Sequence, residues 1–410
     1  MHESIRSRLA RNVGVRALSD FLPKDAPISF GVFAGSSDQR LCVALCCTAP
    51  ALGRMPVVLV HNDLMLERGL CTLAQQRHVS VMLAGPRPMA TPTVTYDPLF
   101  GLDHLGVIRT LGVEKDHALA ARVLDYLTIA DAMHNMSGGA DAIGKYPYRL
   151  HLLRALSHMN YQRLESEVLD LLPGDLAEDL AMRMTMPGDQ RKVADLFDAL
   201  ALRLGTIVSP QQDPGLAVRH PLPSVSSIAL AGGFASVRLP TKDEAVLNHL
   251  AIELDLLLRH GLVPMLVTSG VDIAKTDLAA LIATQAPHKA LCVGLACDYA
   301  TRVVDSNTDV PSLLSTLDRT FVLSCPNTGI ASAFTDAFGT YERTVIERGR
   351  HQSREFMQLL PRSVGAGINE RITQEANVLP EELVGNPTVA LVCGRGMPRP
   401  YVVKRFDERR

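Results

Sequence analysis

The feature that most limits the possible fold is the order of three blocks along the chain. In the first and third blocks, short apolar runs alternate with segments of helical pattern. The long middle block has a helical pattern throughout. In residues 28–111 the runs PVVLVHND and VSVMLAG are continuous and apolar, as in parallel strands covered by helices on both faces. Residues 112–205 repeat apolar residues at helical spacing, with Gly and Pro at the breaks. From residue 226 the alternation resumes in VPMLVTSG, ALCVGLAC and TFVLSC. The pattern predicts an α/β fold, a mainly parallel sheet flanked by helices, with an inserted all-α domain.

The predicted organisation has four parts. Residues 1–24 are expected to form an N-terminal amphipathic helix, because apolar residues recur there with a period of about 3.6. Residues 25–111 form the first part of the α/β domain, and residues 112–205 form the all-α insertion. Residues 206–410 complete the α/β domain and end in a C-terminal hairpin.

Composition narrows the function class. Hydrophobic residues make up 47% and charged residues 20% of the 410 residues, which is typical of a globular chain. The formal net charge is −2, so any contact with nucleic acid has to come from a local basic patch. No apolar stretch approaches the ~20 residues that span a bilayer, and the N-terminus lacks the apolar core of a secretory signal. Eight cysteines without a Cys-x-x-Cys pair indicate buried free thiols in a reducing cytoplasm and no metal site.

A loop between the first strand and its helix occupies the place of a phosphate-binding loop. Residues 29–45 read SFGVFAGSSDQRLCVAL, whereas a working loop reads G-x-x-x-x-G-K-[ST], with one lysine and backbone N–H groups on the phosphates. Laid on the first glycine of the segment, this pattern has no lysine and has a carboxylate at its last position. We therefore expect weak or no binding of ATP and Mg²⁺ at this degenerate position, whose residues are Gly31, Gly35, Ser36, Ser37 and Asp38.

The order of the segments resembles the cytoplasmic ATPase domain of type IV secretion coupling proteins, the TraG/TraD-type conjugative coupling ATPases. The segments that carry the resemblance are PVVLVHNDLMLERG, TVTYDPLFG, IALAGGFASVRLPTKDEAVLNHLAIELDLLL, TFVLSCPNTGIASAFTDAFGTYERTV and VLPEELVGNPTVALVCGRGMPRPYVVKRF. They follow one another in the family's order around a correctly placed helical insertion, over about residues 25–405. The resemblance implies a RecA-like P-loop NTPase fold in a hexameric motor that links DNA or effector substrates to a secretion channel.

The positions at which that family holds its catalytic groups carry other residues here. The strand VPMLV should end in Asp-Glu, which would hold Mg²⁺ and activate water, but it is followed by Thr268-Ser269-Gly270. Asp272 is expected to cap the following helix rather than to replace the metal ligand. Cys297 and Asp298 stand near the place of a glutamine that senses the γ-phosphate. No catalytic residue is therefore assigned. Arg40 is expected to be an exposed helix residue, with a contact to phosphate as the alternative.

Two further groups of residues are candidate sites. His61-Asn62-Asp63 follows a presumed parallel strand, where open α/β sheets bind ligands, but the sequence offers no nucleophile for a hydrolase, and a polar turn that caps the next helix is the preferred interpretation. The C-terminal segment is basic with interleaved aromatic residues, so it is the favoured contact with a partner or with nucleic acid; completion of the sheet edge is the alternative. The contact residues proposed there are Arg395, Arg399, Tyr401, Lys404 and Arg405.

Together these features predict a pseudo-ATPase without a cofactor, a structural or regulatory subunit of a type IV secretion or conjugative transfer apparatus. Its expected partners are subunits of that machinery, including an active coupling ATPase, and further copies of itself in an oligomer. Its expected location is the cytoplasm, at the inner face of the inner membrane through partners. Two alternatives stay open: an ATPase that binds ATP and Mg²⁺ through an unconventional loop to drive DNA or effector transfer, and a DNA-binding adaptor without motor activity.

Overall fold

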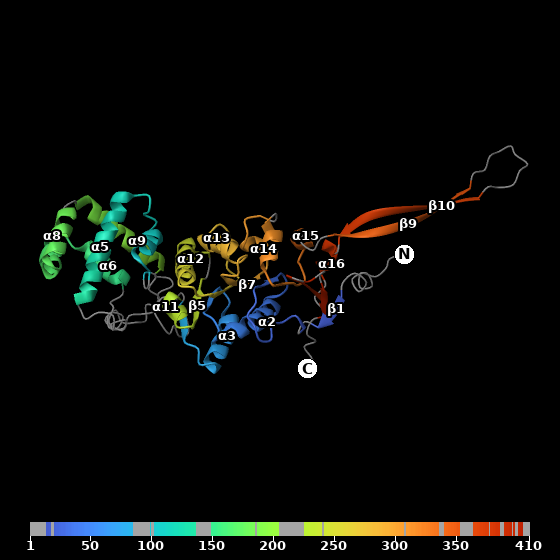
Figure 1. Cartoon of the computed structure of the whole chain (residues 1–410), viewed down its shortest axis with the longest axis horizontal. Coiled ribbons are helices and arrows are strands. Elements are labelled where there is room, and N and C mark those ends of the chain that lie inside the picture. Colours follow the sequence, from blue (N-terminus) through green and yellow to red (C-terminus); the bar gives the residue numbers. More distant parts are fainter. Residues whose placement is uncertain are drawn as a thin grey trace, which may run out of the picture.

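The computed structural model describes most of the chain. The described residues are 14–17, 20–84, 99, 102–136, 149–184, 187–204, 225–239, 242–306, 309–335, 340–352, 364–376, 378–385, 389–395, 397 and 401–404. They form an elongated molecule, with a helical lobe at one end, an α/β body in the middle and a long hairpin at the other end (Figure 1).

The body is built on one large sheet, which has ten strands in the described residues, in the order β1-β12-β11-β8-β2-β7-β6-β3-β5-β4. Neighbouring strands from β8 to β4 run parallel, whereas β11 is antiparallel to both β8 and β12. The strand bounds are β1 (Gly14–Ala17), β2 (Phe30–Phe33), β3 (Val57–His61), β4 (Val81–Ala84), β5 (Phe234–Arg238), β6 (Met265–Ser269), β7 (Cys292–Cys297), β8 (Arg319–Val322), β11 (Val389–Cys393) and β12 (Tyr401–Lys404).

Helices cover both faces of this sheet, which explains why its strands are apolar without alternation. Every residue of β3 and of β7 is buried. Figure 1 shows α2 and α3 on one face and α12 to α15 on the other. The helices of the body are α2 (Ser37–Thr48), α3 (Leu64–Gln76), α11 (Val225–Leu230), α12 (Glu244–Arg259), α13 (Asp277–Gln285), α14 (Val310–Thr316), α15 (Thr328–Thr335) and α16 (Pro380–Leu383).

The central order β8-β2-β7-β6-β3 places the first body strand between two strands that come later in the chain. RecA-like P-loop NTPases have this order. The predicted fold class, a mainly parallel sheet flanked by helices, is therefore confirmed.

The described residues between β4 and β5 contain helices and no strand. The α-helices that precede α11 in this stretch are α4 (His104–Leu111), α5 (His117–Met136), α6 (Arg149–His158), α7 (Tyr161–Glu167), α8 (Gly174–Arg183) and α9 (Pro187–Leu204). α4 packs against α12 of the body, where Thr110 Oγ1 lies 3.2 Å from His249 Nδ1. α5, α6 and α9 pack around buried apolar residues such as Tyr126 and Phe197 and form the lobe.

Two features differ from the sequence-based expectation or were absent from it. Gly14–Ala17, inside the predicted N-terminal helix, is strand β1 and pairs in parallel with β12. The helix prediction is wrong there, because the backbone of β12 offers hydrogen bonds that outweigh a local helical period; residues 1–13 lie outside the described part. A second sheet also forms: β9 (Thr340–Gln352) and β10 (Val364–Ala376) make an antiparallel hairpin of 13 residue pairs that the sequence analysis missed.

Candidate functional site

The candidate site lies at the C-terminal ends of β2, β7 and β8. The register aligns Phe33 of β2 with Cys297 of β7 and with Val322 of β8, so the three strands end at one level. Because β2 lies between two strands that come later in the chain, this is a topological switch point, where open α/β sheets bind ligands. An open cavity of about 600 Å³ lies here, between the loops that follow the three strands.

The loop after β2 is too short to wrap around a phosphate. The strand ends at Phe33 and α2 begins at Ser37, so only three residues connect them. A P-loop has four residues between its two glycines alone. Gly31 lies inside the strand, which corrects its assignment to the loop. It is small for a packing reason, because an added Cβ would lie 2.5 Å from Cε2 of Phe33 and 2.8 Å from Cδ1 of Leu317.

The N–H groups of this loop are bound by the protein itself. The N–H of Ala34 donates to the carbonyl oxygen of Cys297 at 3.2 Å, that of Gly35 to the carbonyl oxygen of Ser324 at 2.9 Å, and that of Ser36 to Oε1 of Gln39 at 3.1 Å. Gly35 has φ +70°, and an added Cβ would lie 2.6 Å from Cβ of Leu323. In a P-loop, such N–H groups point at phosphate oxygens. Here they fasten the loop to β7, to the segment that follows β8, and to α2.

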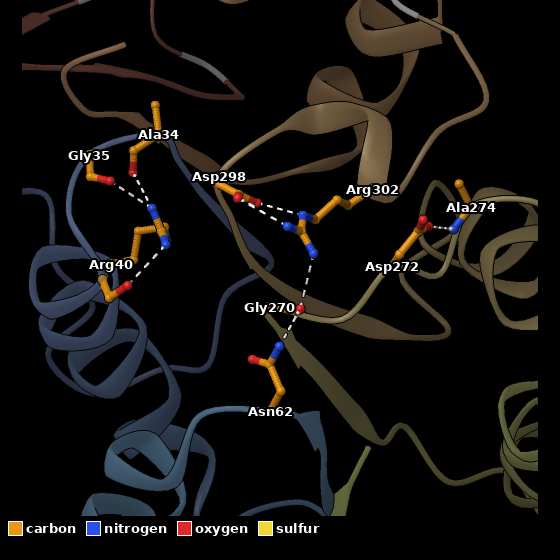
Figure 2. Close-up of polar contacts among 10 residues, drawn as sticks. Ala34, Gly35, Arg40, Asn62, Gly270, Asp272, Ala274, Asp298 and Arg302 are labelled. Carbon is orange, nitrogen blue, oxygen red and sulfur yellow. Dashed lines mark hydrogen bonds and ion pairs between the residues drawn. The ribbon is translucent and has the colours of Figure 1, made fainter. Parts of the chain in front are cut away.

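Arg40 closes the loop from its other side. Its Nη1 donates to the carbonyl oxygens of Gly35 at 2.7 Å and Ala34 at 3.2 Å, and its Nη2 donates to Oγ of Ser37 at 3.3 Å (Figure 2). The side chain is half-buried. The prediction that Arg40 is an exposed helix residue is therefore wrong, because its guanidinium group turns back and holds the loop between β2 and α2 through hydrogen bonds. Asp38 is exposed in the first turn of α2, where its carboxylate would repel an anion.

A second polar network joins the ends of β3, β6 and β7. Arg302 is paired through both Nε and Nη2 with the carboxylate of Asp298, at 2.6 and 3.1 Å. Its Nη1 also donates to the carbonyl oxygen of Gly270 at 3.2 Å, and Nδ2 of Asn62 donates to the same oxygen at 2.7 Å (Figure 2). An added Cβ at Gly270 would collide with the Asn62 side chain. The place at which the resembled family holds a metal ion with carboxylates thus holds an arginine bound by protein oxygens.

Asp272 does not cap α13, which corrects that prediction. The N-cap of α13 is Thr276, whose side chain accepts from the N–H of Ala279. Asp272 lies in the preceding turn, where its Oδ1 accepts from the N–H of Ala274 at 3.0 Å. Both Asp and Thr side chains can accept hydrogen bonds from nearby backbone N–H groups. The sequence alone therefore could not show whether Asp272 or Thr276 caps the helix.

The His61-Asn62-Asp63 segment divides into three roles. Asp63 is the N-cap of α3 and accepts from the N–H groups of Met65 and Leu66, as the preferred interpretation predicted. Asn62 belongs to the network around Gly270. His61 is fully buried inside β3 and its Nε2 lies 2.9 Å both from Oε2 of Glu67 and from Oγ of Ser236.

The buried group of His61, Glu67 and Ser236 was missed by sequence analysis. Oγ of Ser236 donates to Oε2 of Glu67 at 2.7 Å, and all three residues are less than 5% exposed. Burial raises the pKa of Glu67, but the hydrogen bonds from His61 and Ser236 and the charge of Arg238 outweigh it, so that this pKa lies below its usual value. A helix-spaced glutamate followed by a serine on another strand gives no signal in the sequence. The group lies within the core, away from the cavity, and we interpret it as structural.

Three of the five predicted C-terminal contact residues lie in the described part of the chain, away from the cavity loop. Arg395 is exposed after β11, and Tyr401 and Lys404 belong to β12, between β11 and β1. β11 and β8 separate β12 from β2 in the sheet. Arg399 and Arg405 lie outside the described residues. The strand therefore helps to complete the sheet, and its contact with a partner stays a prediction.

The thiols of the described chain differ in pKa and in exposure. A hydrogen bond with Cys46 lowers the pKa of Cys42 to about 6, and Cys42 is exposed. Burial raises the pKa of Cys297 to about 12 and that of Cys325 to about 11. Among the residues that the structure describes, no group of three or more His, Cys, Asp or Glu side chains is arranged to hold a metal ion. None of the helices in this part is both long and apolar enough to cross a membrane.

No protein-family model matches the chain. No curated protein matches it in sequence either. Among solved structures, VirB4 of Thermoanaerobacter pseudethanolicus is similar with 10% sequence identity and a TM-score of 0.45, over 93% of this chain and 90% of that chain. At these values the likeness adds no weight to a functional argument, which has to come from the residues themselves.

Proposed function

We propose that this chain is a non-catalytic relative of the type IV secretion coupling ATPases, which acts as a structural or regulatory subunit of a secretion or conjugative transfer apparatus. The observation that carries the non-catalytic part is the closed loop after β2. Its three N–H groups are bound by Cys297, Ser324 and Gln39, so a phosphate would have to break these hydrogen bonds before it could form its own.

Charge supports the same conclusion. Phosphoryl transfer needs cations that neutralise the developing charge on the phosphate oxygens. The two arginines near the loop are engaged elsewhere: Arg40 by the carbonyl oxygens of its own loop, and Arg302 by Asp298 and Gly270. Asp38 adds a negative charge at the helix start. The fold thus retains the position of a nucleotide site without the groups that nucleotide chemistry uses.

The place in a secretion apparatus rests on the sequence. The five segments that resemble the coupling proteins occur in the family's order around a helical insertion, and the body strands have the order of a P-loop NTPase. A motor domain that no longer hydrolyses ATP can still bind other subunits through its surfaces. We propose that this binding is the reason why the protein has been retained.

Nucleotide binding is tested by isothermal titration calorimetry with ATP and Mg²⁺ up to millimolar concentrations. We expect no saturable heat, and no phosphate release above the rate of a sample without protein. Saturable binding that disappears in an Asp298→Asn or Arg40→Ala variant would show that the site is functional and would support the ATPase alternative.

The secretion role is tested in cells. Deletion of the gene should abolish transfer of DNA or effector, and the wild-type gene should restore it. Ser37→Ala, which removes a hydroxyl from the P-loop position, should restore transfer equally well at equal protein level, because no nucleotide is hydrolysed there. Transfer that is unaffected by the deletion would contradict the role in secretion without bearing on the loop.

A further inference from the structure

A surface groove between α13 and α14 has the properties of a docking site. Its volume is about 510 Å³, and it lies on the face of the sheet that α12 to α15 cover, opposite α2 and α3. Buried apolar residues, Ile282, Val303 and Leu313 among them, form its floor. The charged residues that line it are exposed and mostly acidic: Asp277, Asp305, Asp309 and one cation, Lys275. An apolar floor with a negative rim suits an occupant that presents apolar side chains between basic ones.

The β9–β10 hairpin carries such a segment at its outer end. Each strand has 13 residues, which corresponds to a length of about 44 Å. The hairpin points away from the body and from the lobe (Figure 1). The register pairs Gln352 with Val364 at the outer end, so residues 353–363 connect the strands there. These residues lie outside the described part; their sequence is SREFMQLLPRS, in which Phe356, Met357, Leu359 and Leu360 stand between two arginines.

We propose that residues 353–363 of one copy of this chain dock into the α13–α14 groove of a second copy. The two features match in chemistry. Four apolar residues face the apolar floor, and a segment with a net charge of +1 (Arg354, Glu355 and Arg362) meets a rim with three carboxylates and one lysine, whose net charge is −2. They also match in reach. A hairpin that extends about 44 Å away from its own body carries its outer end to another molecule and not to its own groove. An isolated two-stranded hairpin is at best marginally stable in water, and docking of its end would stabilise it.

This contact is heterologous, because the groove and the hairpin end are different surfaces of the same chain. Each copy therefore offers one of each, and repetition of the contact gives a ring when the rotation closes or a filament when it does not. The inference does not depend on the state of the nucleotide site, so it can fail without affecting the proposed function.

Peptide binding tests the groove directly. The probe is a fluorescein-labelled peptide of residues 351–365, titrated with full-length protein that carries Phe356→Glu and Leu360→Glu, so that its own hairpin ends do not compete. Saturable anisotropy is expected. Ala283→Trp, at an exposed position that lines the groove, should reduce the affinity at least roughly tenfold by filling the space.

The acidic rim has its own variant and control. Changing the three rim aspartates to asparagine should lower the affinity for the peptide by about tenfold. It should also make this affinity less dependent on salt concentration, as expected for the loss of exposed ion pairs. Asp170→Asn with Asp175→Asn, two exposed carboxylates of the helical lobe, is the matched control and should leave the affinity within about twofold.

A mixing experiment tests the assembly of the whole chain by sedimentation velocity. Wild-type protein should form larger species as its concentration rises. The groove variant Ala283→Trp and the hairpin-end variant Phe356→Glu/Leu360→Glu should each sediment as a monomer. Mixed together, they should form a heterodimer and nothing larger, because only one intact groove and one intact hairpin end can meet.

Three results would overturn the proposal: a peptide that binds the Ala283→Trp variant as tightly as the parent, wild-type protein that stays monomeric at all concentrations, or a mixture of the two variants that shows no heterodimer. Binding of the hairpin end to anionic lipid vesicles, unaffected by the Ala283→Trp substitution, would assign the segment to a membrane surface instead. Circular dichroism of each variant checks that loss of binding does not result from unfolding.

Discussion

Replacement of Arg40 by alanine separates three roles for this residue. As a clamp it stabilises the loop, as an exposed helix residue it contributes almost nothing, and as a phosphate ligand it affects only nucleotide binding. The structure supports the clamp, through two hydrogen bonds to carbonyl oxygens and one to a hydroxyl. The substitution is therefore expected to destabilise the loop without changing the response to ATP.

The magnitude follows from the charge of the donor and from its exposure. A hydrogen bond to a charged group contributes about 1.5–3 kcal/mol net. Arg40 makes three such contacts, but it is half-exposed and one Nη1 atom serves two of them, so we expect a total loss of about 1.5–3 kcal/mol for the Arg40→Ala variant. Since ~1.4 kcal/mol corresponds to a factor of ten, local opening of the loop should become roughly 10- to 150-fold more frequent.

Hydrogen exchange followed by mass spectrometry measures this opening in place, which suits a chain with several structural parts. Peptides that contain the N–H groups of Ala34, Gly35 and Ser36 should exchange faster in Arg40→Ala, while peptides from the helical lobe should not change. Arg40→Lys should restore only part of the protection, because one ammonium group cannot reproduce the fork of a guanidinium. Arg163→Ala, which removes an exposed ion pair within a helix of the lobe, is the control and should leave the exchange of the loop peptides unchanged.

Unchanged exchange in the loop peptides would refute the clamp. Loss of an ATP-dependent protection that the wild type shows would refute the proposal that the site is closed.

Further predictions concern the loop, the buried polar group and the thiols. Gly35→Ala should cost about 2–4 kcal/mol in a urea titration followed by circular dichroism, because the new Cβ meets the side chain of Leu323 and the positive φ adds strain; a cost below about 0.5 kcal/mol would contradict the packing. Ser236→Ala should cost about 1.5–3 kcal/mol, because Glu67 loses one of its two donors in a buried site. Since the folded-state pKa of Glu67 lies below its usual 4.5, its contribution should be complete above that pH and should decline as the pH falls further, and Glu67→Gln should flatten this part of a stability-against-pH curve. Iodoacetamide at neutral pH should modify Cys42 first, with a rate that rises through about pH 6 and then levels off; Cys42→Ser should remove the fast phase, and a midpoint near the ordinary thiol value would show that Cys46 does not lower this pKa.

The sequence by itself determined the class of the fold, and it gave the reason to expect weak or no binding of ATP and Mg²⁺. Runs such as Val57–His61 predict buried strands because helices on both faces remove the alternation of polar and apolar residues. The missing lysine and the carboxylate of Asp38 are visible in the chain without any structure. These properties are local, so a pattern of neighbouring residues is sufficient to read them.

Only the tertiary structure decided what the site residues do. The acceptors that close the loop, Cys297 and Ser324, lie more than 250 positions along the chain from Ala34 and Gly35, and the parallel register brings them together. The partners of Glu67 were hidden for the same reason, since Ser236 comes from another strand. β1 formed where a helix was predicted, because the edge of a sheet supplies hydrogen bonds that a local period does not contain. Pairings between distant segments depend on strand order and register, and neither is encoded in the spacing of residues along one segment.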